Sequence, residues 1–198
     1  ALPSAAENRV LVTGLEFLHD AATKIWQDYD QAGFTDAQDL DALIDDPAPG
    51  QTGDEYTPAM LSAQLFPAGA EKIHRLTNIN THANHYAYAA SSAAQKLLCT
   101  DPAYDALQCA AGGMDANGIS LLSSVLYTSG CHSGLTVPET DAKPLDLPEQ
   151  MARKGVVAYI GNTGYGWGLR NGRGLTEDLM ENITTELLTA KSIPIGKA

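Results

Sequence analysis

One cysteine stands in a sequence context that suits a nucleophile. Cys131 lies in the segment SGCHSG, directly after the apolar run 119–128, and small residues flank it on both sides. Such residues let the backbone turn sharply at a strand end and leave the thiol accessible. A thiolate forms more readily beside a base, and His82 or His85, at the end of another predicted strand, would supply one. The alternative is a buried, inert thiol, because most free cysteines are small core residues.

The same side chains also have the chemistry of a zinc site. His82, His85, Cys131 and His132 are four side chains of types that zinc prefers. However, an H-x-x-H pair at a strand end does not direct both rings to one face, and adjacent side chains of an extended chain diverge. Zinc is therefore the weaker interpretation, and we expect neither a metal nor a cofactor.

The other two cysteines lie in one predicted surface connection, residues 90–118. Cys99 and Cys109 are ten positions apart. A disulfide between them would staple this connection and leave Cys131 as the odd free thiol, whereas two unrelated buried thiols are the alternative. The disulfide favours an oxidising compartment, so we expect an extracellular or periplasmic protein.

A glycine-rich loop provides candidate substrate contacts. The segment GNTGYGWG begins at Gly161 and carries two aromatic side chains, Tyr165 and Trp167, which suits a backbone that bends closely around a ligand. Asn162 and Thr163 would add polar contacts. The segment lacks the spacing of dinucleotide-binding and phosphate-binding loops. The alternative is an ordinary turn-rich loop whose aromatic side chains pack on the core.

The elements that must position these segments follow an α/β pattern. Apolar, β-branched runs predict strands over residues 9–15, 73–80, 119–128 and 156–160. Helical spacing predicts helices over residues 17–26, 39–44, 58–66 and 147–154, and a last helix with Thr176 as its N-cap. Strands that alternate with helices predict a mostly parallel sheet covered on both faces. In such sheets the chemistry lies outside the carboxyl ends of the strands, where the His and Cys segments follow.

Size and charge narrow the function classes. The 198 residues are 44% hydrophobic and 18% charged, so we expect one folded domain over residues 1–198. This domain could be an excerpt of a longer chain. The net charge of −12 repels phosphate backbones, so nucleic acid is not an expected partner. No apolar run reaches the length of a membrane span. The acidic loop 46–57 does not have the spacing of an EF-hand, which favours a solvated loop over a calcium site.

The ordered set of segments resembles a known peptidase family. LVTGLEFLHDAA, NINTHANHY, SSVLYTSGCHSGLTVP, GVVAYIGNTGYGWG and the closing LTEDLM with IPIGKA are similar to the catalytic domain of gingipain-type cysteine peptidases, which share a fold group with caspases, legumains and clostripain. The resemblance extends from about Val10 to the end of the chain, and the Cys segment is its most specific part. It implies a caspase-like three-layer α/β/α sandwich and the catalytic half of a longer domain.

The resemblance also implies an activity and its residues. In this fold group the catalytic His ends one strand before a Gly, and the catalytic Cys ends the neighbouring strand. Carried over, Cys131 is the nucleophile and His82 the catalytic His, with His85 as the competing base. Ala83 stands where the family has Gly, and its N–H together with that of Cys131 would form the oxyanion hole. We therefore expect a cysteine endopeptidase acting on peptide or protein substrates through an acyl-enzyme. A non-catalytic binding or structural module that retains the fold is the alternative.

Overall fold

The predicted strands form one parallel sheet in the computed structural model, which describes residues 9–35, 39–45, 56–90, 97–103, 105, 107–110, 113–114, 119–137, 145–169 and 172–189. Within these residues the helices are α1 (His19–Gln31), α2 (Pro58–Leu65), α3 (Leu147–Arg153) and α4 (Leu175–Thr189), with short 3-10 helices η2 (Glu16–Leu18) and η3 (Ala70–Lys72). The strands are β1 (Arg9–Gly14), β2 (Leu40–Ile44), β3 (His74–Asn80), β4 (Ala83–Asn84), β5 (Ala87–Ala89), β6 (Leu97–Cys99), β7 (Val125–Thr128) and β8 (Ala158–Ile160). The predicted acidic loop lies outside the described residues except for Tyr56 and Thr57.

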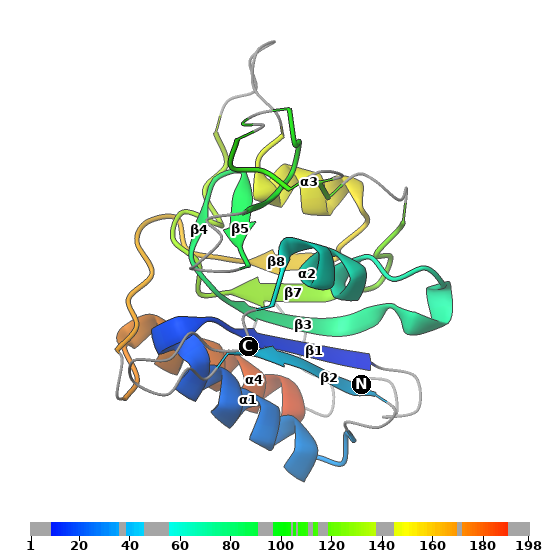
Figure 1. Ribbon diagram of the computed structural model, residues 1–198. Coiled ribbons are helices and arrows are strands. Elements are labelled where there is room, and N and C mark those ends of the chain that lie inside the picture. Colours follow the sequence, from blue (N-terminus) through cyan, green and yellow to red (C-terminus); the bar gives the residue numbers. More distant parts are fainter. Residues whose placement is uncertain are drawn as a thin grey trace.

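The main sheet has five strands in the order β2-β1-β3-β7-β8, and every neighbouring pair is parallel (Figure 1). A separate antiparallel sheet joins β4, β5 and β6. The α/β class and the parallel sheet predicted from the sequence are therefore confirmed. Because all five strands of the main sheet run in the same direction, the segments that follow them emerge at one edge of this sheet.

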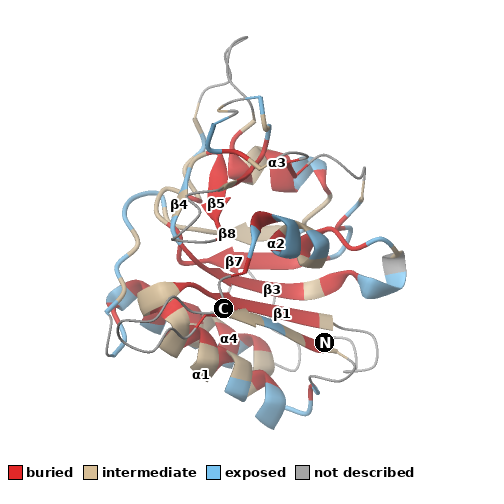
Figure 2. Cartoon of the chain, viewed as in Figure 1, coloured by how far each residue is buried: buried red, intermediate tan, exposed pale blue. Residues whose placement is uncertain are grey.

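The core lies on both faces of the main sheet, because successive strand side chains point to opposite sides. In β1, Leu11 packs in a cluster with residues of α2 and α3, whereas Val10 and Val12 pack in a second cluster with residues of α1 and α4. The central strands β1, β3 and β7 are buried along most of their length, whereas the edge strands β2 and β8 are mostly half-buried (Figure 2). Helices thus cover the sheet on both sides, as the alternation of elements predicts.

Two predicted elements, residues 39–44 and 119–128, differ from the structure in type or in length. Residues 39–44, predicted as a helix, include strand β2, because pairing with β1 from Val10–Leu40 to Gly14–Ile44 gives this short run a full ladder of hydrogen bonds. A helix of six residues would be too short to stabilise itself. The run 119–128 becomes a strand only from Val125 onward, after a turn in which Ser123 has a φ of 67°.

The last helix begins at Leu175, two residues earlier than an N-cap at Thr176 predicts. Thr176, expected as the N-cap, lies inside α4, where its buried hydroxyl accepts the N–H of Trp167. Leu179, expected on the apolar face of the helix, is 49% exposed.

The predicted connection 90–118 contains strand β6, which pairs with β5, so it is more than a surface loop.

Candidate active site

Three polar side chains follow the carboxyl ends of three adjacent strands. The parallel register aligns Thr13 of β1 with Ile79 of β3, and Ile79 with Thr128 of β7. Glu16, His82 and Cys131 each come three residues after one member of this aligned row. The strand order therefore brings a carboxylate, an imidazole and a thiol to the same edge of the sheet.

The turn that carries Cys131 packs directly on the turn that carries His82. Gly130 has no side chain, and a Cβ built there would lie 2.5 Å from the Cβ of Ala83 and 3.2 Å from the carbonyl oxygen of Thr81. The Ser129 N–H also donates to the Ile79 carbonyl at 3.1 Å. Glycine at this position thus allows the two strand-end turns to meet.

The backbone around Cys131 leaves one N–H group without an acceptor. The N–H groups of Gly130, His132, Ser133, Gly134 and Leu135 all donate to oxygen atoms of the chain. Among the described residues, the Cys131 N–H alone in this run donates to none. A free N–H beside a nucleophile is the donor that an oxyanion hole requires.

Ala83 offers a second such donor. The Ala89 N–H donates to the His82 carbonyl at 2.8 Å, which makes His82 and Ala89 a hydrogen-bonded pair of the β4–β5 hairpin. Hydrogen-bonded and non-bonded pairs alternate in an antiparallel ladder, so the next pair, Ala83 and Tyr88, does not exchange hydrogen bonds. The Ala83 N–H is therefore directed away from β5.

His82 is paired with a carboxylate that the sequence analysis did not include. Its Nε2 lies 3.3 Å from Oε2 of Glu16. The Phe17 and His82 rings pack in a T-shaped arrangement with their centroids 5.3 Å apart. Because Nε2 contacts Glu16, Nδ1 is the ring nitrogen that remains for chemistry. The Glu16 backbone has a φ of 54°, a left-handed conformation that costs free energy in a residue with a side chain. Strained backbone of this kind is typical of functional positions.

Glu16 was missed because its position depends on strand order. It follows the predicted strand 9–15, and its type and place at a strand end were visible in the sequence. Only the pairing of β1 with β3, however, shows that this strand end is the neighbour of His82.

His85, the competing base, lies in a different environment. Its ring centroid is 5.2 Å from that of His132, and the His132 ring is 4.7 Å from that of Tyr165. No ion pair with a carboxylate involves His85 among the described residues, in contrast to His82. The two histidines thus differ in their partners, a carboxylate for His82 and a second imidazole for His85.

The zinc alternative does not fit this arrangement. In the described part of the chain, no three His, Cys, Asp or Glu side chains converge as a metal site. The physical reason is that His82 is turned to Glu16 and Phe17, whereas His85 lies on His132. His82, His85 and Cys131 do not act as one ligand set.

The glycine-rich loop lies against the Cys131 turn. The Gly166 N–H donates to the Cys131 sulfur at 3.3 Å, and a Cβ on Gly166 would collide with the Ser129 carbonyl. The His132 N–H donates to the Gly164 carbonyl at 2.7 Å. An N–H directed at sulfur stabilises a thiolate, as other donors near cysteine do. The loop thus forms one wall of the candidate site.

The four predicted substrate contacts in this loop divide into two groups. The Asn162 side-chain amide donates to the Ser129 carbonyl at 2.7 Å, so it holds the loop on the Cys131 turn. Thr163 is exposed, as are Tyr165 at 71% and Trp167 at 69%, which leaves these three side chains available to a ligand.

Two buried tyrosines, Tyr88 and Tyr159, connect the sheet to the turn that carries Cys131. Burial raises the pKa of Tyr88 and of Tyr159 well above the ordinary value, so both hydroxyls keep their protons. Tyr159 donates to the Ser133 carbonyl at 2.9 Å, and Tyr88 lies 2.6 Å from the Tyr159 oxygen. The chain of hydrogen bonds links β5 and β8 to the residue two positions after Cys131.

The structure confirms the predicted arrangement of the cysteines. Cys99 and Cys109 form a disulfide, and Cys131 is the free thiol, partly exposed. None of the described helices has the length and apolar content needed to cross a lipid bilayer.

Comparisons with family models, with curated proteins and with solved structures find no match to this chain. The assignment of a function therefore depends on the geometry of the site.

Proposed function

We propose that this protein is a cysteine endopeptidase with a caspase-like fold, in which Cys131 is the nucleophile and His82 the general acid–base. The observation that carries the proposal is the alignment of Glu16, His82 and Cys131 at the carboxyl ends of β1, β3 and β7. A thiol, an imidazole and an orienting carboxylate at one edge are the groups that thiol-dependent acyl transfer needs.

The proposed reaction has two halves. The Cys131 thiolate attacks the peptide carbonyl carbon, a C–S bond forms, and the N–H groups of Cys131 and Ala83 bind the oxyanion. His82 gives a proton to the amine as the C–N bond breaks. Water then attacks the thioester, His82 takes its proton, and the C–S bond breaks to release the carboxylic acid product and the thiolate.

The substrate proposed here is an extended peptide that lies along the loop from Asn162 to Gly168. The exposed Thr163, Tyr165 and Trp167 side chains would contact it, and the loop glycines let its backbone come close. The Cys99–Cys109 disulfide supports an extracellular or periplasmic location for this activity.

A fluorogenic peptide library tests the proposal. We expect cleavage by the wild type and none above background by Cys131→Ala, with both proteins folded as judged by circular dichroism. His82→Ala should lower kcat by about a hundred-fold to ten-thousand-fold, the usual contribution of general acid–base catalysis. His85→Ala should lower kcat by less than about ten-fold, and a larger loss there would exchange the two histidines.

The same library separates a second candidate function, a non-catalytic binding module. Ala83 in place of Gly is the observation that favours it. Such a module would cleave no peptide in the library, and its Cys131 would react with iodoacetamide no faster than a free cysteine at mildly acidic pH. The peptidase should show both cleavage and rapid, His82-dependent alkylation.

A further inference from the structure

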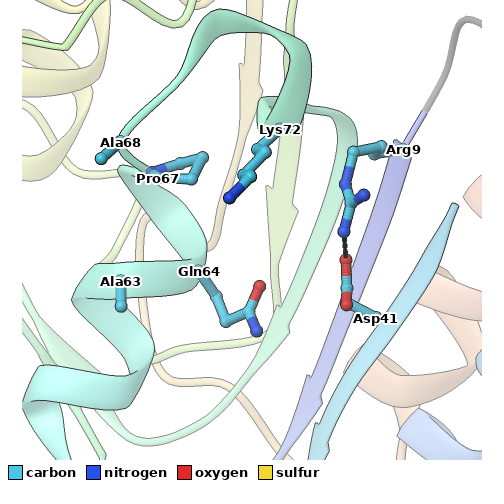
Figure 3. Close-up of a pocket in the computed structure, with 7 residues that line it drawn as sticks. All are labelled: Arg9, Asp41, Ala63, Gln64, Pro67, Ala68 and Lys72. Atoms are coloured by element: carbon cyan, nitrogen blue, oxygen red, sulfur yellow. Dashed lines mark hydrogen bonds and ion pairs between the residues drawn. The ribbon is translucent and has the colours of Figure 1, made fainter. Parts of the chain in front are cut away.

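A pocket of about 370 Å³ opens at the edge of the sheet opposite to Cys131. Its lining residues come from the start of β1, from β2, and from the segment between α2 and β3 (Figure 3): Arg9, Asp41, Ala63, Gln64, Pro67, Ala68 and Lys72. β1 begins at Arg9 and β3 at His74, whereas Glu16 and His82 follow the other ends of these strands. The pocket is therefore separate from the candidate active site.

A buried histidine lies behind the pocket wall. His74 is only 3% exposed, and its Nε2 lies 2.8 Å from Oδ2 of Asp41 while its Nδ1 lies 2.8 Å from the Gln64 carbonyl oxygen. The hydrogen bond from His74 and the neighbouring Arg9 lower the pKa of Asp41, so this carboxylate is ionised. The His74 ring thus holds two lining residues of the pocket, Asp41 of β2 and Gln64 of α2, from inside the fold.

Two positive side chains line the pocket itself. Arg9 forms an ion pair with Asp41, and Lys72 has no ion pair with any described residue. Figure 3 shows Lys72 and the Gln64 side chain on one side of the pocket and the Arg9–Asp41 pair on the other. Two positive side chains thus share the pocket with one carboxylate. This local excess contrasts with the net charge of −12 of the whole chain.

We propose that this pocket binds a small molecule through an anionic group, a carboxylate or a phosphate. Lys72 and Arg9 supply the attraction, and the Gln64 amide supplies a directional hydrogen-bond donor. The short side chains of Ala63, Pro67 and Ala68 contact the remainder of the ligand. The volume lies at the lower end of the range of small-ligand sites, and the net charge of −12 of the whole chain repels polyanions such as nucleic acid.

Protein-observed NMR with ¹⁵N-labelled protein tests this proposal without any measurement of peptidase activity. Sodium phosphate and sodium succinate are titrated separately, against sodium chloride at matched ionic strength. We expect saturable shifts centred on the Gln64 side-chain amide and the Lys72 backbone. Saturation by both anions would mean that any oxyanion group is accepted, and saturation by one alone would identify the group.

Charge variants locate the binding site. Lys72→Gln should weaken the apparent affinity by at least about ten-fold, and Lys72→Arg should retain it. Arg153→Gln is the matched control, because it removes one exposed positive charge outside the pocket lining and should change the affinity by less than about two-fold. The proposal is overturned if neither anion saturates by about 20 mM, if chloride gives the same shifts, or if the Lys72 and Arg153 variants weaken binding equally.

Discussion

At the scale of single residues, Glu16 combines a side-chain contact with His82 and a backbone conformation that is unfavourable for its type. Its carboxylate lies 3.3 Å from His82, while its φ of 54° would suit glycine better. A residue retained at such a position contributes something other than stability. In the proposed reaction Glu16 is a positioning residue, because its contact is with the His82 ring.

Glu16→Gly separates these two contributions. Glycine adopts a positive φ without strain, so the free energy of unfolding should stay unchanged or rise by up to about 1 kcal/mol. The kcat should fall by about ten-fold or more because the His82 ring loses its orienting partner, while KM changes little. Urea denaturation and steady-state kinetics on the same preparation measure both quantities. Loss of stability in parallel with loss of kcat would instead assign Glu16 a purely structural role.

At the scale of elements, the site depends on how closely two turns approach each other. Gly130 allows the turn after β7 to contact Ala83, and Gly166 allows the glycine-rich loop to reach the Cys131 sulfur. The other end of this loop is fixed to α4, where the buried Glu177 accepts the N–H groups of Leu169 at 3.0 Å and Gly174 at 2.6 Å. The loop is thus held at both ends, beside Cys131 and at the start of α4.

Gly130→Ala tests the close approach of the two turns. The new Cβ would lie 2.5 Å from the Ala83 Cβ, so one turn must move, and we expect a loss of about 1–3 kcal/mol in stability together with slower alkylation of Cys131. Gly164→Ala in the neighbouring loop is the control. Its Cβ would have no atom within 4 Å, and we expect little change in either measurement. Equal effects of the two substitutions would show that the approach of the turns has no special role.

The disulfide constrains a different element, the small sheet of β4, β5 and β6. Closure of so short a loop is worth about 2–3 kcal/mol in the chain-entropy account, and the bonded residues Cys99 and Cys109 lie outside the main sheet. A Cys99→Ala, Cys109→Ala double variant should therefore lose hydrogen-exchange protection in β5 and β6 first, with β1 and β3 still protected. Loss of protection throughout the main sheet would contradict this local role.

The sequence predicted the elements better than their arrangement. Periodicity and apolar runs located β1, β3, β8, α2 and α3 because burial dictates those patterns locally. It failed for β2, where a short apolar run is compatible with helix or strand until its partner is known. The contacts of Glu16 with His82 and of Asn162 with Ser129 could not be predicted either, because both depend on which segments become neighbours. Residue types at strand ends were readable, whereas contacts between them were not.

At the scale of the whole molecule, ion pairs at the two edges of the sheet serve different purposes. At the carboxyl edge the Glu16–His82 pair is partly exposed and belongs to the candidate active site. At the other edge Asp41 joins Arg9 and the buried His74, and thereby connects β2, β1 and β3 across three strands. Removal of the Asp41 charge would break the ion pair with Arg9 and weaken the hydrogen bond to the buried His74, which is unfavourable.

The lowered pKa of Asp41 makes this second network a source of pH-dependent stability. The hydrogen bond from His74, followed by Arg9, lowers the pKa in the folded state below the ordinary value of 3.8, so the unfolded chain binds the proton more tightly. The stabilisation is therefore fully present above pH 4 or so and is lost as the pH falls through the lowered folded pKa. Asp41→Asn should cost about 1–3 kcal/mol at pH 7 and progressively less below about pH 4, measured by urea denaturation across this range. The exposed Asp30 on α1 provides the control, because Asp30→Asn should change stability by less than about 0.5 kcal/mol at every pH. A difference between Asp41→Asn and wild type that persists undiminished at the acidic end would mean that the carboxylate charge is not what stabilises the strand edge.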